Sequence, residues 1–380
     1  MPWGDKTVES LREEFLCAAN ICTNFSSLCR EFGITRRTGY KWLKRDADSE
    51  TLSNKSHAAK TIANKTSNET EQLILSIRTD NPAWGGKTIK SVLETMGCEN
   101  IPSIKTCNNI LKRNNCINPA ESLKHKPYQR FEKEHCNEMW QTDFKGDFVL
   151  LDGTRCFPLT ILDDHSRFSI MIDPKDNTRG VKDSFCNAFK RFGMPNSILS
   201  DNGAQFSGFR GGYTQFERWL MDCNILPIHG RIMHPQAQGK IERFHRTMKQ
   251  ELLIHNEFYD LSDADNHLQK WRIKYNEIRP HEALGMKCPA DVYKESTRNY
   301  TDEIIGYDYG GMYPMRKVNN WGYLRFDKWQ VYLSETMANT HLEIRPNPHG
   351  DSFIVCYRNF KIAELDAQNG KLINRKISRA

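Results

Sequence analysis

The fold is decided by residues 139–173, which read MWQTDFKGDFVLLDGTRCFPLTILDDHSRFSIMID. Apolar residues alternate or run together over 139–150, 155–163 and 167–173, and Asp152-Gly153 is a turn signal between the first two runs. These runs predict three consecutive antiparallel strands. Downstream, helical patterns over 180–192, 214–222, 238–255 and 263–277 are interspersed with short strand patterns over 197–200 and 225–229. This order predicts a mixed α/β sheet covered by helices.

The residues before this core have helical patterns. A short helix over 25–32 ends at Gly33, and Thr35 can cap a basic helix over 36–44, with Tyr40 and Leu43 as its apolar side. A helix, a turn and a basic helix form the helix-turn-helix pattern, whose second helix lies in the DNA major groove. The residues that would contact DNA are Arg36, Arg37, Lys41 and Lys44. An ordinary helical hairpin with a solvated basic face is the alternative.

The chain is expected to be multidomain. We assign 1–46 to this first helix-turn-helix and 70–116 to a second one, with a flexible linker over 47–69 and a basic linker over 117–135. The basic linker is expected to run along DNA or across a partner subunit. The mixed α/β core and a helical tail occupy 136–298. Short strand patterns separated by Gly, Asn and Pro over 310–380 predict a small five-stranded, all-β barrel.

Composition narrows the functional classes. The net charge of +7 favours a polyanionic partner. The 12 cysteines contain no CxxC pair, so a disulfide framework is not expected. No secretory signal and no run of 18 apolar residues is visible, so we expect a cytoplasmic, nucleoid-associated protein with no membrane partner.

Three acidic residues are candidates for chemistry. Asp143 lies within the first strand, Asp201 follows a strand end, and Glu242 lies on a helix. Each has an ordinary explanation, because Asp-Asn-Gly is a common turn and a helical Glu usually faces water. Together, such carboxylates can hold two divalent cations about 4 Å apart for an in-line phosphoryl displacement. Oxygen ligands suit Mg²⁺, with Mn²⁺ as a substitute.

The helix that carries Glu242 offers a second indication. His245, Arg246 and Lys249 follow it at i+3, i+4 and i+7, and are expected on the same face. A carboxylate and three potential cations in one stripe would meet a phosphate backbone beside bound metal, so these three residues are predicted to contact DNA. Pairing of Glu242 with Arg246 within the helix is the alternative, and is worth only about 0.3–0.5 kcal/mol.

At this point the sequence resembles a known family. Residues 140–143, 200–206 and 234–246 look like the catalytic blocks of retroviral-type integrases and bacterial insertion-sequence transposases, and 28–42 looks like the helix-turn-helix of those transposases. The resemblance implies an RNase H-like core whose Asp143, Asp201 and Glu242 are the DDE triad. It also implies that the C-terminal barrel is similar to the small SH3-like domains of integrases.

Two departures from the family pattern stand out. Asp201 and Glu242 are separated by 40 residues, more than is usual, and the extra length fits a surface loop in the Gly-rich stretch 207–212. Retroviral integrases also begin with a His/Cys zinc module. Here the first histidine is His57, and the early cysteines lack ligand spacing, so helix-turn-helix units replace that module.

The resemblance implies a transposase that binds the terminal inverted repeats of its insertion sequence and catalyses metal-dependent end cleavage and strand transfer. Asn202 and Gln238 are expected to line the site. The expected partners are double-stranded DNA, as element ends and target, and further copies of the chain in a dimer or larger synaptic complex, with no small-molecule substrate. Two rivals stay open: a catalytically inactive DNA-binding regulator derived from a transposase, and a nuclease acting on RNA–DNA hybrids.

Overall fold

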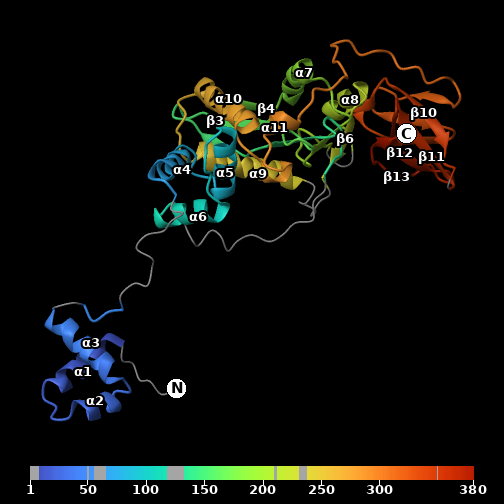
Figure 1. The fold of residues 1–380 in the computed structure, drawn as a ribbon. Coiled ribbons are helices and arrows are strands. Elements are labelled where there is room, and N and C mark those ends of the chain that lie inside the picture. Colours follow the sequence, from blue (N-terminus) through green and yellow to red (C-terminus); the bar gives the residue numbers. More distant parts are fainter. Residues whose placement is uncertain are drawn as a thin grey trace. The chain divides into compact units, whose positions relative to one another are not determined.

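The structure, a computed structural model, describes residues 8–48, 51–54, 66–117, 132–208, 212–230, 238–348 and 350–380 (Figure 1). The chain forms two compact units, residues 1–65 and 66–380. Parts of both expected linkers (49–50, 55–65 and 118–131), and of the glycine-rich stretch (209–211), lie outside the described residues, as do residues 231–237. No helix in the described ranges is long and apolar enough to cross a membrane.

The first unit contains three helices, α1 (Val8–Ala19), α2 (Phe25–Glu31) and α3 (Arg36–Ala47). The side chain of Thr35 caps α3 by accepting a hydrogen bond from the Thr38 amide. Gly39 allows α2 and α3 to approach closely, because a Cβ there would lie 2.9 Å from Cys29 Sγ. The sequence placed Tyr40 on the apolar side of α3, which is wrong: Tyr40 is 54% exposed, whereas Trp42 is 8% exposed and fills the core.

The second unit begins with three further helices, α4 (Asn68–Asp80), α5 (Gly86–Thr95) and α6 (Ile104–Arg113). They enclose a small core of their own. Trp84, between α4 and α5, attaches them to the following domain, because its indole nitrogen donates to Glu251 Oε1 at 3.1 Å. Glu251 also accepts hydrogen bonds from Trp271 Nε1 at 3.2 Å and from Arg279 Nε at 2.9 Å.

The central sheet has six strands: β1 (Trp140–Phe144), β2 (Phe148–Val149), β3 (Arg155–Asp163), β4 (Ser169–Lys175), β5 (Ser197–Ser200) and β6 (Leu226–His229). The five longer strands lie in the order β4-β3-β1-β5-β6, and β2 pairs with the start of β3. β3 pairs antiparallel with both β1 and β4, while β5 runs parallel to β1 and β6 runs parallel to β5. An antiparallel meander extended by two parallel strands is the RNase H-like arrangement, so the predicted mixed sheet is confirmed.

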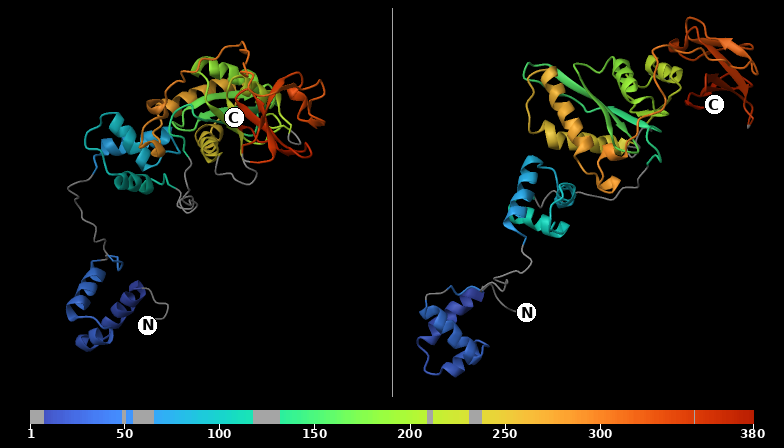
Figure 2. Two further views of the ribbon diagram at one scale, coloured as in Figure 1. Left: turned by 90° about the vertical axis from the view of Figure 1, so that its right-hand side faces the viewer. Right: turned by 45° about the horizontal axis from the view of Figure 1, so that its top comes forward.

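Helices cover both faces of this sheet (Figures 1 and 2). One face packs against α7 (Val181–Phe192) and α8 (Gln215–Asp222), and the other against α9 (Gly239–Met248) and α10 (Leu261–Glu277). Side chains of β3 alternate between these cores, with Ile161 on the first side and Leu162 on the second. The long helix predicted over 238–255 continues from α9 as a π-helical turn, η4 (Lys249–Leu253).

Two short elements follow, η5 (Glu282–Leu284) and α11 (Pro289–Val292), and then an all-β region. A six-stranded sheet has the order β13-β12-β11-β10-β7 with β14 beside β12, and β8 and β9 form a separate hairpin. Their bounds are β7 (Met315–Lys317), β8 (Tyr323–Phe326), β9 (Trp329–Tyr332), β10 (His341–Pro346), β11 (Ser352–Tyr357), β12 (Phe360–Asp366), β13 (Leu372–Asn374) and β14 (Ser378–Arg379), with a 3-10 turn η6 (Glu335–Met337). The five predicted strands are present, and β7, β13 and β14 were missed.

The all-β region packs directly on the core. Tyr213, just before α8, donates its hydroxyl to the carbonyl of Ile362 at 2.5 Å, and Tyr357 donates to Asp222 Oδ1 at 2.5 Å. Met221 of α8 is fully buried in the same apolar cluster as Leu342 and Ile362. The last strands are therefore fixed on the side of α8.

Candidate active site

Two of the three acids lie side by side at one edge of the sheet. β1 and β5 are parallel, with Trp140 opposite Ile198 and Gln141 opposite Leu199. Two residues further along each strand are Asp143 and Asp201. Because neighbouring strands are about 4.8 Å apart, these carboxylates share the carboxyl edge of the sheet, where α/β proteins bind ligands.

Asp143 is in an unfavourable environment for a negative charge. Burial, followed by the charge of Asp201 and then a smaller contribution from Glu242, raises the pKa of Asp143 to about 7. A carboxylate with such a pKa exchanges a proton near neutrality unless a cation balances it. The three acids therefore act on one another electrostatically, with Glu242 the more weakly coupled.

Glu242 is exposed in the first turn of α9, and the start of this helix is firmly anchored. The amide of Ile241 donates to Gln141 Oε1 at 3.3 Å, and Gln141 Nε2 donates to Asp164 Oδ1 at 2.7 Å. Lys240 Nζ lies 2.5 Å from Asp164 Oδ2. Because Gln141 and Asp143 are two residues apart in one strand, both face α9.

Among the described residues, His245 places a basic side chain near Asp143, with its Nδ1 3.8 Å from Asp143 Oδ2. Its Nε2 lies 2.7 Å from the Thr160 hydroxyl, which itself donates to the carbonyl of Asp143 at 2.9 Å. Because the Thr160 hydroxyl donates its proton to Asp143, it can only accept from His245. Nε2 of His245 therefore carries the imidazole proton, and the unprotonated Nδ1 directs its lone pair toward Asp143. Burial, and secondarily the charge of Lys145, lower the pKa of His245 to about 3.

The predicted role of His245 is therefore corrected. It was expected to contact DNA as a cation, but it is 8% exposed and neutral at physiological pH. Arg246 and Lys249 are exposed. Lys145, which the sequence analysis missed, lies close enough to Lys249 for that charge to add to burial in lowering the pKa of Lys145. Lys145 follows Asp143 by two residues and so points to the same side of β1, a signal that could have found it.

Asn202 and Gln238 both lie near Asp201. Asn202 is exposed and donates to the carbonyl of Gly230 at 2.9 Å. A Cβ on Gly230 would lie 3.9 Å from Gln238 Nε2, so Gln238 adjoins the same turn. Within the described residues Gln238 Nε2 is buried and has no hydrogen-bond partner. A buried donor without an acceptor is costly, so it is available to an oxygen of a ligand.

The residue before Asp201 belongs to a chain of hydrogen bonds that joins β5, β6 and α8. Ser200 Oγ lies 3.1 Å from His229 Nδ1, and His229 Nε2 lies 2.8 Å from Glu217 Oε1. Glu217 also caps α8 by accepting from the Thr214 amide. These contacts could not be predicted from the sequence, because a Glu that caps a helix gives no indication that its other oxygen contacts a histidine of the next strand.

The acids are not gathered into a ready-made metal site. Among the described residues, no three His, Cys, Asp or Glu side chains are close enough together to hold a metal ion. Asp143 and Asp201 are suitable ligands by chemistry, because hard carboxylate oxygens suit Mg²⁺ and a cation would relieve the repulsion that raises the pKa of Asp143.

Comparison with protein families identifies the domain that holds these acids. The model of one integrase core domain matches residues 133–235, and the model of a second integrase core domain matches residues 224–289. The chain carries an integrase core domain. The two matches together contain Asp143, Asp201 and Glu242.

Several proteins similar to this part of the chain are encoded by insertion sequences. The chain is 30% identical over 156 residues to an uncharacterized 39.2 kDa protein of insertion element IS476 from Xanthomonas euvesicatoria, covering 40% of this chain and 43% of that protein. It is 27% identical over 157 residues to an IS407 protein from Burkholderia multivorans (41% and 54%), and 28% identical over 180 residues to the Escherichia coli IS2 transposase InsD (45% and 58%). The chain spans about half the length of the curated relatives it matches.

Solved structures give a weaker likeness. The catalytic core of HTLV-2 integrase, in complex with magnesium, is 18% identical with a TM-score of 0.33, and the match covers 42% of this chain and 97% of that one. The integrase core assignment therefore depends on the family matches and on the strand order seen here.

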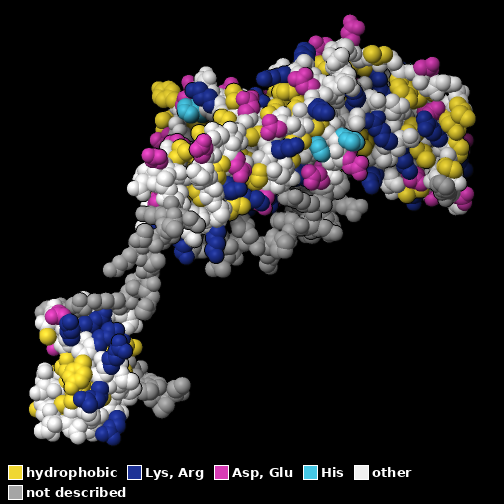
Figure 3. Space-filling view, in the orientation of Figure 1, with side chains coloured by type: hydrophobic (Ala, Val, Ile, Leu, Met, Phe, Trp, Pro, Cys, Tyr) yellow, Lys and Arg dark blue, Asp and Glu magenta, His cyan; other side chains and the backbone are white. Residues whose placement is uncertain are grey.

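The predicted DNA-contacting residues of the first unit lie outside the integrase core. Arg36, Arg37, Lys41 and Lys44 are all exposed on α3. Figure 3 shows Lys and Arg side chains gathered on one face of this unit.

Proposed function

We propose that this protein is a transposase that binds the ends of an insertion sequence and catalyses DNA cleavage and strand transfer. The observation that carries the proposal is the position of Asp143 and Asp201, each two residues beyond the paired Gln141 and Leu199 at the carboxyl edge of the sheet, where burial and the charge of Asp201 raise the pKa of Asp143 to about 7. Such a site suits a divalent cation.

In this proposal, Asp143, Asp201 and Glu242 are the metal ligands. Two Mg²⁺ ions, for which Mn²⁺ could substitute, would lower the barrier to phosphoryl transfer by activating the attacking oxygen and stabilising the leaving one. Glu242 is the residue that must move most, and an exposed side chain changes rotamer within nanoseconds.

The other residues bind and orient DNA. Lys145, Arg246 and Lys249 would contact the phosphates of the terminal DNA, and the buried amide of Gln238 would donate to a phosphate oxygen. Neutral His245 would act as a positioning residue through Thr160, because its Nε2 donates to the Thr160 hydroxyl, which in turn donates to the backbone carbonyl of Asp143.

Two successive displacements account for the reaction. Water attacks the phosphodiester at the element end, the bond to the 3′ oxygen breaks, and that oxygen takes up a proton to become a 3′ hydroxyl. The hydroxyl then attacks a target phosphodiester and releases a second 3′ hydroxyl. The second step exchanges one phosphodiester for another, so it consumes no energy source.

The proposal also assigns roles to the two N-terminal helical units and to the C-terminal sheets. The two helical units would be helix-turn-helix modules over 1–46 and 70–116, the first reading the terminal repeats through α3, and the C-terminal sheets would correspond to the SH3-like domain of integrases. Because two ends must be joined, the active form would be a dimer or a larger complex. The protein would act in the compartment that holds the DNA.

A labelled duplex that carries one end of the element, incubated with full-length protein and Mg²⁺, tests this function. We expect a nicked strand and joined products from the native chain, and neither from Asp143→Asn or Asp201→Asn.

One observation favours a second candidate, a DNA-binding regulator without catalytic activity: the described residues contain no preformed three-ligand site. Binding of the end without nicking or joining by the native chain would support this regulator and overturn the transposase.

A further inference from the structure

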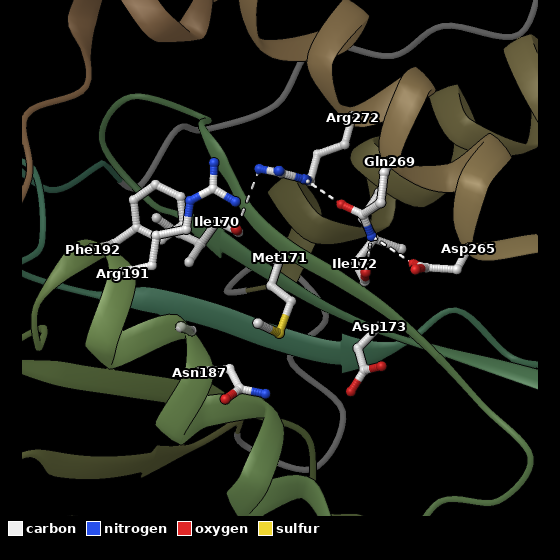
Figure 4. Close-up of a pocket in the computed structure, with 11 residues that line it drawn as sticks. Ile170, Met171, Ile172, Asp173, Asn187, Arg191, Phe192, Asp265, Gln269 and Arg272 are labelled. Carbon is white, nitrogen blue, oxygen red and sulfur yellow. Dashed lines mark hydrogen bonds between the residues drawn. The ribbon is translucent and has the colours of Figure 1, made fainter. Parts of the chain in front are cut away.

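A different pair of charged residues lies between α7, β4 and α10. A cavity of about 190 Å³ is lined there by Ile170, Met171, Ile172, Asp173, Asn187, Ala188, Arg191, Phe192, Asp265, Gln269 and Arg272 (Figure 4). An adjoining hollow of about 370 Å³ shares Arg191, Phe192, Gln269 and Arg272 with it. The two arginines therefore stand at the junction of both hollows. None of the three acids lines either one.

The two guanidinium groups lie close enough to repel each other. Within the described residues neither forms an ion pair, and the charges of Glu277 and Asp265 each act on Arg272 less strongly than Arg191 does. Arg272 Nε donates to Gln269 Oε1 at 2.9 Å and Nη1 donates to the carbonyl of Ser169 at 3.2 Å, both neutral acceptors. Arg191 is exposed and makes no hydrogen bond or ion pair with another described residue. Burial, and next the charge of Arg191, lower the pKa of Arg272. An anion between the two cations would relieve this repulsion.

The walls of the cavity indicate which anion fits. Ile170, Met171 and Phe192 offer apolar surface next to the arginines (Figure 4). Asp265 accepts a hydrogen bond from Gln269, Asp173 also lines the cavity, and Glu277 lines the adjoining hollow. Three acidic side chains around the two hollows disfavour a polyanion such as a DNA backbone, whereas a single negative charge held between the two arginines meets less repulsion. Guanidinium groups bind carboxylates through paired hydrogen bonds.

We propose that Arg191 and Arg272 form a binding site for a carboxylate borne on an apolar body. The site does not depend on the transposase proposal, because it uses no residue of the three-acid cluster.

Arg191→Gln is the diagnostic variant, because Arg191 is exposed and its replacement leaves the hydrogen bonds of Arg272 to β4 intact. Lys182→Gln, on the same helix, is the matched control. The probes are benzoate, which has a carboxylate and an apolar ring, and inorganic phosphate, which has no apolar part. Binding to the full-length protein is followed by ligand-observed NMR at constant ionic strength.

We expect saturable benzoate binding to the native chain and to Lys182→Gln, weakened at least about tenfold in Arg191→Gln, with phosphate binding about tenfold more weakly than benzoate. The proposal is overturned if benzoate does not bind the native chain, if Arg191→Gln binds it equally well, or if phosphate binds as tightly.

Discussion

Lys240 Nζ lies 2.5 Å from Oδ2 of Asp164, a carboxylate with no exposed surface. The other oxygen of Asp164 accepts from Gln141, which in turn holds the first turn of α9. This ion pair therefore joins the turn after β3 to the helix that carries Glu242. It fixes where that helix begins.

Lys240→Met should destabilise the fold by about 3 kcal/mol, because removing one partner leaves the buried charge of Asp164 uncompensated. Urea unfolding measures this loss, and amide hydrogen exchange should show faster opening of the first turn of α9. Lys87→Met is the control, since it breaks an exposed pair with Glu282 and should cost less than about 1 kcal/mol. Equal losses in both variants would contradict the anchoring role.

The contribution of Asp143 to stability should fall as pH rises from about 4 to 7, opposite in sign to the contributions of His245 and His281, whose pKa values are lowered by burial. The folded protein holds the Asp143 proton up to a pKa of about 7, whereas the unfolded chain releases it near 3.8, so the folded state binds more protons between these values. Asp143→Asn removes the repulsion and should stabilise the protein at pH 8 by on the order of 2 kcal/mol. The difference in free energy of unfolding between the native chain and Asp143→Asn, measured at pH 5 and at pH 8, isolates the contribution of Asp143. An Asp143→Asn variant no more stable than the native chain at pH 8 would show that the pKa is not raised.

Mg²⁺ should recover this stability at pH 8. A ligand at ten times its dissociation constant stabilises a fold by about 1.4 kcal/mol. Calorimetry with and without MgCl₂ should show the rise in the native chain and lose it in Asp143→Asn and Asp201→Asn. Asp147→Asn is the control and should keep the full rise, because Asp147 lies between β1 and β2 and pairs with Arg155. A rise that persists in both cluster variants would place the ion elsewhere.

The basic side chains of α9 and η4 should differ in whether they contact DNA. Arg246→Gln and Lys249→Gln should each lower the slope of log affinity against log salt for an element end by about 1, because each removes one phosphate contact. His245→Gln should leave the slope unchanged, since His245 is buried and neutral, while cleavage falls at least tenfold through misplacement of Asp143. Fluorescence anisotropy at several salt concentrations gives the slopes. A reduced slope in His245→Gln would restore it as a DNA contact.

Much of the secondary structure could be predicted because apolar periodicity follows burial directly. The strand expected over 139–150 was nevertheless interrupted at Gly146, whose φ of +89° breaks the extended run. A glycine permits such a positive φ angle but adopts it in only some structures, so the break could not be predicted from the sequence.

Some residues of the candidate site could be predicted from the sequence, and others could not. Asp143 and Asp201 could be placed at one edge from strand order alone, whereas the surroundings of His245 required the packing of α9. Ile241, Phe244 and Met248 form the buried stripe of that helix, and His245 follows Ile241 by four residues. The i+3 spacing from Glu242 was read as a shared exposed face, but the apolar stripe takes precedence when a helix packs on a sheet.

Glu251 has a consequence for how such proteins diversify. One carboxylate within the π turn accepts hydrogen bonds from Trp84, Trp271 and Arg279, which come from three separate stretches of the chain. A lineage that exchanged helices α4 to α6 for a foreign module without a matching indole would leave that buried acid short of a donor. Replacement of Trp84 would therefore require a compensating change at Glu251, and we expect the two positions to vary together.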